Sequence, residues 1–228
     1  MQIAGIQKTT LVDYPGKIAA TVFTRGCSFR CPFCHNPELV VPEKFLPLIS
    51  EDEILDFLES RIGKLQAVCI TGGEPTLQKD LPEFIHKLKE MDYLVKLDSN
   101  GWNPEILEKN IKSEEIDYIA MDIKSSLEKY SLTTGTKVNI ENIQKSIKLI
   151  MESGIDYEFR TTVCHPLHEV ADFEKIGEMI SGAKRYFIQN FVKSKHVDEH
   201  ENFESFSDIE LKEAKEIMEK YIKEVKIR

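Results

Sequence analysis

The sequence predicts an α/β protein whose parallel strands form a partial, TIM-like (β/α)6 barrel. Short apolar or β-branched runs alternate with amphipathic stretches, which is typical of βα units around a parallel sheet. A full eight-unit barrel takes about 250 residues, so six units within 228 residues indicate an open barrel. The six strand-like runs are Ile18–Phe23, Ala67–Thr71, Leu94–Leu97, Tyr118–Met121, Tyr157–Val163 and Tyr186–Phe191.

Amphipathic stretches between these runs predict the helices. Ser50 and Glu53 have the spacing of a capping box, and so do Ser207 and Glu210 before the last helix. We expect one domain over residues 1–228, with an N-terminal segment at 1–17 and a C-terminal helix at 205–228. Two further stretches repeat apolar residues at helical spacing, namely Leu81, Phe84, Ile85 and Leu88, and then Ile140, Ile143, Ile147 and Ile150.

Composition and charge argue against several classes of protein. The net charge of −9 argues against nucleic-acid binding, which needs a basic surface. The chain has no run of about 18 apolar residues that would predict a membrane span. The polar and charged residues of Met1–Lys17 lack the apolar core of a signal peptide. We therefore expect a cytoplasmic protein.

Three of the five cysteines, Cys27, Cys31 and Cys34, lie within eight residues. An odd, crowded set of cysteines does not suit a disulfide framework and indicates a metal or cluster site. Iron–sulfur clusters are usually held by four cysteines, so this C-x3-C-x2-C spacing predicts a [4Fe–4S] cluster with one iron open to another ligand. The alternative is a structural zinc site with Cys69 or His35 as the fourth ligand.

Glycine or polar residues follow the next three strand-like runs. Gly72-Gly73-Glu74 follows the second run, Asp98-Ser99-Asn100 the third and Asp122-Ile123-Lys124 the fourth. The carboxyl ends of parallel strands meet at one edge of a sheet, and ligands bind there. We therefore expect these groups to share one site with the cysteine loop.

The cysteine motif after the first strand, with aromatic Phe33 before its last cysteine, resembles the radical S-adenosylmethionine (SAM) superfamily. In that family the amino and carboxyl groups of SAM's methionine fill the open iron position. The resemblance implies that Phe33 packs near the adenine, and that Glu74 acts on SAM directly or holds its loop. It further implies that the ammonium of SAM contacts Gly72, Gly73 and Glu74, and that its ribose and amino group contact Asp98, Ser99 and Asn100. The methionine end would contact Asp122 and Lys124, and Arg160 would face the barrel mouth.

The chain also resembles a narrower group, the activating proteins of anaerobic ribonucleoside-triphosphate reductase. The resemblance rests on Ile3–Lys8, on Leu11–Lys17 and on Gly26–Leu39. It implies that a flavodoxin or ferredoxin supplies an electron for reductive cleavage of SAM to a 5′-deoxyadenosyl radical. It also implies that this radical removes a hydrogen from a glycine of the partner, a glycyl-radical enzyme.

Three other functions stay open. The chain could activate another glycyl-radical enzyme of the pyruvate formate-lyase type, could be a radical SAM enzyme acting on a small molecule or peptide, or could be a non-catalytic metal-binding or electron-transfer module. Two departures weigh against a pyruvate formate-lyase activase. His165-Pro166 stands where Pro-Gly often follows the fifth strand, and Gln189-Asn190 ends the last strand where those activases carry a SAM-contacting histidine.

The remaining cysteines and histidines are expected to be structural or exposed. Cys69 lies within a strand-like run and Cys164 follows one, so both are expected to have structural roles. His35 follows the last cysteine of the motif and is expected to orient the cluster loop through hydrogen bonds. His196 and His200 lie in a polar, charged segment and are expected in solvent.

Overall fold

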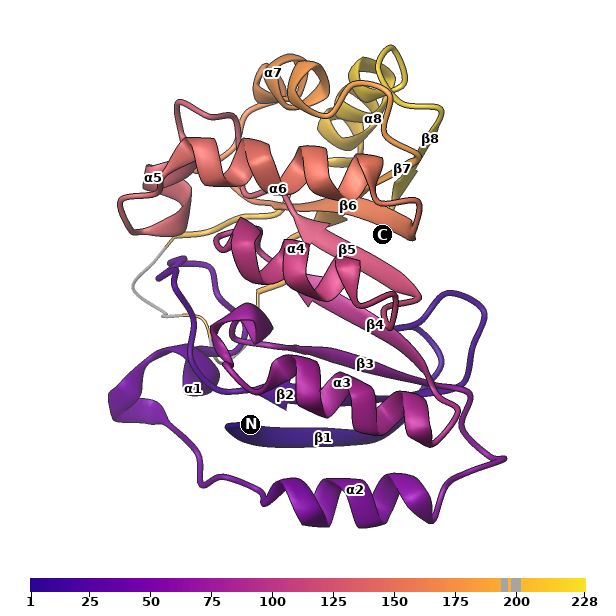
Figure 1. Cartoon of the computed structure of the whole chain (residues 1–228). Coiled ribbons are helices and arrows are strands. Elements are labelled where there is room, and N and C mark those ends of the chain that lie inside the picture. The colour runs from indigo at the N-terminus through magenta and orange to yellow at the C-terminus, as the bar shows by residue number, and fades with distance from the viewer. Residues whose placement is uncertain (194–196, 198–201) are drawn as a thin grey trace.

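Eight strands form one sheet in which each strand pairs with the next along the chain (Figure 1). The computed structural model describes residues 1–193, 197 and 202–228. Strand β1 runs antiparallel to β2, and all later neighbours are parallel. The strands are β1 Ile3–Thr10, β2 Ala19–Thr24, β3 Ala67–Gly72, β4 Leu94–Ser99, β5 Tyr118–Asp122, β6 Asp156–Val163, β7 Arg185–Asn190 and β8 Glu224–Ile227.

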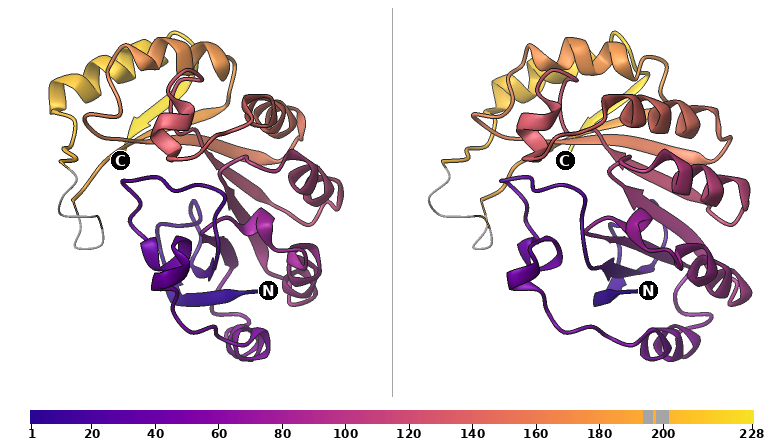
Figure 2. Two further views of the ribbon diagram at one scale, coloured as in Figure 1. Left: turned by 90° about the vertical axis from the view of Figure 1, so that its left-hand side faces the viewer. Right: turned by 60° about the vertical axis from the view of Figure 1, so that its left-hand side comes forward.

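Helices connect the parallel strands and cover the convex face of the curved sheet, as Figure 2 shows from two sides. Their apolar stripes pack against the outward side chains of the strands and build one large core. None of the helices in the described part of the chain has the length and apolarity that a membrane span requires. The helices are α1 Pro37–Val40, α2 Glu51–Glu59, α3 Leu81–Glu90, α4 Pro104–Lys112, α5 Tyr130–Thr134, α6 Ile140–Glu152, α7 Asp172–Met179 and α8 Asp208–Met218, with short 3₁₀ turns η1 Pro42–Lys44 and η2 Pro75–Leu77.

The predicted open barrel is confirmed. The six strand-like runs of the sequence correspond to β2–β7. Within the described residues the sheet ends at β1 and β8, which do not pair with each other, so the barrel is not closed. Figure 2 shows these two edge strands at opposite ends of the curve.

Two strands lie outside the predicted set, one at each end of the chain. Segment 1–17 contains β1 in addition to the connection into β2. The helix expected over 205–228 is wrong in its extent, because α8 ends at Met218 and residues Glu224–Ile227 form β8 beside β7. In β8 only Val225 is buried. In a short edge strand with one buried side chain, apolar and polar residues do not alternate clearly. From the sequence alone, such a strand cannot be distinguished from the charged end of a helix.

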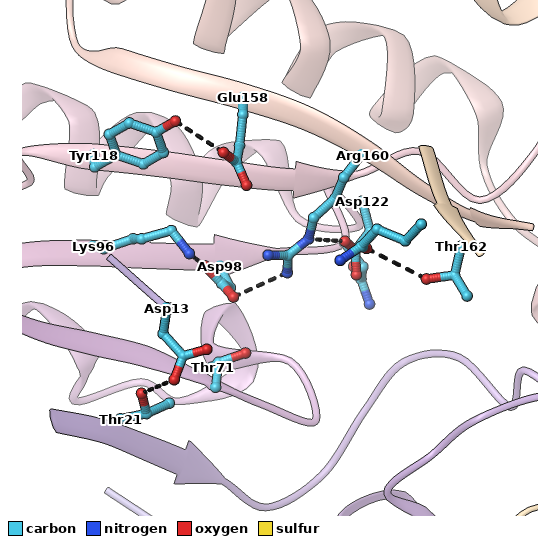
Figure 3. Close-up of polar contacts among 12 residues, drawn as sticks. Asp13, Thr21, Thr71, Lys96, Asp98, Tyr118, Asp122, Glu158, Arg160 and Thr162 are labelled. Carbon is cyan, nitrogen blue, oxygen red and sulfur yellow. Dashed lines mark hydrogen bonds and ion pairs between the residues drawn. The ribbon is translucent and has the colours of Figure 1, made fainter. Parts of the chain in front are cut away.

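The inner face of the sheet carries polar and charged side chains. Successive side chains of a strand point to opposite faces. In β6, Tyr157 and Phe159 belong to the outer core, whereas Glu158 and Arg160 point to the inside, as Figure 3 shows for the latter pair. Glu158 accepts a hydrogen bond from the hydroxyl of Tyr118 at 3.0 Å. The fold therefore supports a charged site inside the curve of the sheet.

Candidate active site

A cavity of about 380 Å³ lies at the carboxyl ends of the parallel strands. Its walls come from the loop after β2 and from the ends of β3 to β6. The structure therefore brings together every residue that the sequence assigned to the cluster and to SAM. The cavity is lined by all of them, namely Cys27, Cys31, Phe33, Cys34, Gly72, Gly73, Glu74, Asp98, Ser99, Asn100, Asp122, Lys124 and Arg160.

The cysteine motif lies on the loop between β2 and α1, and backbone hydrogen bonds hold this loop in place. The N–H of Gly26 donates to the carbonyl of Leu39 at 2.7 Å. The N–H of Arg30 donates to the carbonyl of Thr134 at 2.8 Å, which ties the loop to α5. None of the thiols on this loop is in a disulfide. The motif is thus a closed, fixed turn with three free thiols.

These thiols fit a metal cluster. Burial raises the pKa of Cys27 to about 12 and that of Cys31 to about 11, so the metal-free thiols are uncharged near neutral pH and a bound metal must displace their protons. A structural zinc site takes four protein ligands, whereas this loop supplies three cysteines. Three thiolates would hold three irons of a [4Fe–4S] cluster and would leave the fourth iron open to another ligand.

The Gly-Gly-Glu turn packs directly against the start of the cysteine loop. A Cβ on Gly72, where φ is +117°, would lie 2.4 Å from the nitrogen of Thr24. A Cβ on Gly73 would lie 1.9 Å from the carbonyl oxygen of Gly26. Only glycine permits this approach of two backbones, so both glycines are required for the position of Cys27, the residue after Gly26.

Glu74 joins the ends of β3 and β4. Its carboxylate accepts hydrogen bonds from the N–H and hydroxyl of Thr76 at 3.1 and 2.5 Å, from the hydroxyl of Ser99 at 2.9 Å and from the N–H of Asn100 at 2.7 Å. Burial raises the pKa of Glu74, and these hydrogen bonds oppose the shift. The sequence left two roles open for Glu74, namely acting on SAM directly and holding its loop. These hydrogen bonds favour the second role.

An interior ion-pair chain crosses the sheet below the cavity mouth. We use this name for Lys96, Asp98, Arg160, Asp122 and Lys124. The guanidinium of Arg160 bonds Asp98 at 2.9 Å through one terminal nitrogen and bonds Asp122 through Nε, as Figure 3 shows. Lys96 lies 2.6 Å from Asp98, and Lys124 lies 2.9 Å from Asp122. The expectation that Arg160 faces the barrel mouth and is paired is therefore met.

Ion pairing keeps Asp98, Asp122 and Lys124 charged. Burial alone would raise the pKa of Asp122, but Arg160 and Lys124 outweigh it and hold that pKa well below its usual range. Burial alone would lower the pKa of Lys124, but the surrounding acidic groups, Asp122 foremost, together raise it above its usual range. In the same way Arg160 and Lys96 hold the pKa of Asp98 below its usual range. The cavity therefore has fixed charges of both signs, as a zwitterionic ligand requires.

Polar residues that the sequence did not assign to the site also line the cavity, on two flanks. Thr21 donates to the carboxylate of Asp13 at 2.6 Å, and Gln7 of β1 lies on the same flank. Thr162 donates to the side chain of Gln189 at 3.4 Å on the other flank. Because side chains alternate between the two faces of a strand, Thr162 could have been placed on the same face of β6 as Arg160. The residues around Asp13 contain no sequence pattern that shows the loop between β1 and β2 folding back into the barrel.

His168 is a buried residue that the spacing of the histidines did not mark. Its Nε2 lies 2.8 Å from the carbonyl oxygen of Lys124, and its Nδ1 lies 3.2 Å from the nitrogen of Cys164. Because a carbonyl only accepts, the shorter contact to Lys124 assigns a proton to Nε2; Nδ1 lies 3.2 Å from both the nitrogen and the carbonyl oxygen of Cys164, and in the neutral ring it accepts from that nitrogen. The ring of His168 also meets that of Phe33 edge-on, with centroids 6.1 Å apart. It thus connects the ends of β5 and β6 to the cysteine loop.

The other cysteines and histidines are placed as follows. Cys69 and Cys164 are both buried, at 1% and 0% exposure, in agreement with structural roles. Nε2 of His35 lies 2.9 Å from the carbonyl oxygen of Val192, so the cysteine loop is tied to the segment after β7. His196 and His200 lie outside the described residues.

The model of the Radical SAM superfamily matches residues 21–180. The chain belongs to this superfamily. The matched span contains the cysteine motif, the Gly-Gly-Glu turn and the interior ion-pair chain. The protein is therefore a radical SAM enzyme, and a [4Fe–4S] cluster and SAM are the cofactors of its family.

Known proteins resemble this radical SAM enzyme over different shares of its length. A Methanocaldococcus jannaschii protein named as a glycyl-radical enzyme activating enzyme is 34% identical, over 99% of this chain and 95% of that protein. The pyruvate formate-lyase-activating enzyme of Listeria monocytogenes is 33% identical, over 60% of this chain and 59% of that protein. The crystal structure of Streptococcus suis SuiB bound to S-adenosylmethionine superposes with a TM-score of 0.67 at 15% identity, over 89% of this chain and 48% of that one, and this likeness shows the shared fold alone.

Proposed function

We propose that this radical SAM enzyme is an activase that installs a radical on a glycine of a partner glycyl-radical enzyme. One observation carries the proposal: the cysteine loop, the Gly-Gly-Glu turn and the Asp-x-Lys strand end converge on one cavity in an open barrel. The Methanocaldococcus jannaschii relative, which is named for this activity, matches nearly the whole chain and supports the choice.

Each cofactor has residues that suit it. When bound, the cluster and SAM supply the electron transfer and the 5′-deoxyadenosyl radical on which the reaction depends. In the proposal Cys27, Cys31 and Cys34 hold the cluster. Phe33 is 4% exposed and packs edge-on against its aromatic neighbours, so it offers the adenine a rigid apolar surface.

The strand ends orient SAM in this proposal. Lys124 attracts the methionine carboxylate, and Asp122 keeps Lys124 charged. Asp98, Ser99 and Asn100 offer acceptors and donors to the ribose and amino group. The backbone of Gly72 and Gly73 approaches the ammonium, while Glu74 fixes the turn that carries them. Arg160 holds the two aspartates in register. These groups are prearranged by their mutual hydrogen bonds and need little rearrangement when SAM binds.

The open barrel suits a substrate that is part of another protein. The sheet ends at β1 and β8 in the described residues, and we propose that a loop of the partner enters along this side of the barrel. We propose anaerobic ribonucleoside-triphosphate reductase as this partner, because the segments Ile3–Lys8 and Leu11–Lys17 resemble its activating proteins. Gln189 lines the cavity where pyruvate formate-lyase activases carry a histidine, which supports the same choice. We further propose a flavodoxin or ferredoxin as the electron donor and the cytoplasm as the location.

The proposal is tested by two anaerobic measurements. Protein reconstituted with iron and sulfide is mixed with dithionite and SAM, and 5′-deoxyadenosine is measured by liquid chromatography. A candidate anaerobic reductase is then added, and a glycyl doublet is sought by EPR spectroscopy. We expect both products. A doublet that forms only with a pyruvate formate-lyase would select that activase instead, and 5′-deoxyadenosine without a doublet for any glycyl-radical partner would contradict the activase function.

A further inference from the structure

Lys96 is a buried cation to which neither the sequence motifs nor the proposed reaction assigns a role. It lies on the inner face of β4, two residues before Asp98 and therefore on the same face. Its side chain is 3% exposed, and its Nζ lies 2.6 Å from Oδ1 of Asp98. Figure 3 shows both side chains on the inside of the sheet, with Arg160 reaching Asp98 from β6.

Lys96 is the third cation of the interior ion-pair chain, which has two carboxylates. A third buried cation is unfavourable unless it gains a specific contact, because burying a lysine removes its hydration. The specific contact here is the one to Oδ1 of Asp98.

Lys96 completes the fixation of the Asp98 carboxylate. Arg160 holds Oδ2 of Asp98 at 2.9 Å, and Lys96 holds Oδ1 at 2.6 Å. With one contact on each oxygen, the carboxylate plane cannot turn about the bond to Cβ without breaking an ion pair. Without Lys96 the carboxylate could pivot about its contact with Arg160. Asp98 also lines the cavity, so its orientation determines which lone pairs face a ligand.

We propose that Lys96 is a positioning residue for SAM, which acts by holding the carboxylate of Asp98 in the orientation that accepts hydrogen bonds from the ribose hydroxyls. The inference rests on the assignment of Asp98 to the SAM site and needs no particular partner enzyme. The activase function is tested by glycyl-radical formation, whereas the role of Lys96 is tested by SAM binding. A protein that activates no glycyl-radical enzyme could still bind SAM through Asp98, so one proposal can fail without the other.

The surroundings of Lys96 permit a clean substitution. Its neighbours across the sheet are Cys69 of β3 and Tyr118 of β5. Both belong to a small apolar cluster that surrounds the base of the barrel. A methionine has nearly the length and volume of the lysine stem, so K96M keeps the packing and removes only the charge.

The experiment measures SAM binding to anaerobically reconstituted protein by equilibrium dialysis, together with KM and kcat for 5′-deoxyadenosine formation. We expect K96M to weaken SAM binding about tenfold and to raise KM by a similar factor, with kcat changed less than twofold. K96R restores binding to within about threefold, because a guanidinium reaches the same oxygen. The matched control is K89M, since Lys89 forms an ion pair with Asp117 at 2.8 Å outside the cavity.

A double-mutant cycle distinguishes positioning from a structural role. If Lys96 acts through Asp98, then K96M causes no further loss of SAM affinity in a D98N background. Losses that multiply in the double variant would overturn the proposal, and so would a K96M dissociation constant within twofold of wild type. A K96M protein that holds less iron than K89M, or that melts well below it, would assign Lys96 to the fold and overturn the proposal too.

Discussion

Replacing Gly73 by alanine tests the packing that joins the Gly-Gly-Glu turn to the cysteine loop. The new Cβ would lie 1.9 Å from the carbonyl oxygen and 2.6 Å from the carbonyl carbon of Gly26. Real Cβ atoms essentially never come within 3.0 Å of such atoms, so the two backbones must separate by at least about 1 Å. Neither contact is with a flexible side chain that could move away instead.

This separation disrupts the hydrogen bonds between the two segments. The N–H of Glu74 donates to the carbonyl of Gly26 at 2.8 Å, and the N–H of Gly73 donates to that of Thr24 at 2.9 Å. A buried group that loses its partner costs about 1–3 kcal/mol. We therefore expect G73A to lower the free energy of unfolding by about 3 kcal/mol, which corresponds to a fall in Tm of about 6–12 °C for a chain of this size.

Thermal unfolding of the metal-free protein, followed by circular dichroism, measures this effect. The matched control is G5A, because a Cβ on Gly5 would meet only the side chain of Phe23, at 3.8 Å. We expect G5A to melt within about 2 °C of wild type. A G73A protein that melts as G5A does would refute the close approach of Gly73 to Gly26 and the argument that a glycine is required at position 73.

Three further predictions concern the same site. R160M leaves Asp98 and Asp122 with one lysine each but removes a charge-assisted hydrogen bond from each carboxylate, and it is expected to lower the free energy of unfolding by about 3–6 kcal/mol in urea titrations. Burial lowers the pKa of His168 in the folded protein. The neutral imidazole therefore contributes stability above the unfolded-state pKa of about 6.5, and this contribution is lost as the pH falls toward the folded-state pKa. The wild-type protein should lose stability between pH 7 and pH 5 by an amount that H168Q does not lose. C27A should fail to assemble a complete cluster, as measured by bound iron and sulfide.

Each of these predictions has a control. For R160M the control is R185M, because Arg185 pairs with Asp156 at 2.9 Å at the opposite end of the sheet, and an equal loss in both variants would contradict a special role of the ion-pair chain. For C27A the control is C69A, which removes a buried thiol from β3 and should retain a full cluster. A stability profile of H168Q with the same slope as wild type between pH 7 and pH 5 would contradict the third prediction.

Local patterns predicted most of the sheet, and the residues that they assigned to the site all line one cavity. Each of β2 to β7 is a short run rich in apolar or β-branched residues and is bounded by turn residues, and the buried outer face of the strands makes such runs distinctive. The cavity residues followed because parallel strands place all their carboxyl ends at one edge. The edge strands β1 and β8 were not predicted, because an edge strand needs few buried side chains and its pairing partner lies elsewhere in the chain.

The sequence by itself determined the chemistry of this protein: three thiols at a spacing that suits a cluster, and the residue types at each strand end, since these depend on neighbours along the chain. Only the tertiary structure decided how those groups act on one another. Glu74 holds Ser99 and Asn100, Arg160 holds Asp98, and His168 holds the end of β5, across separations of up to 62 residues. Such contacts depend on how strands are paired and curved in space, and no pattern along one strand records them.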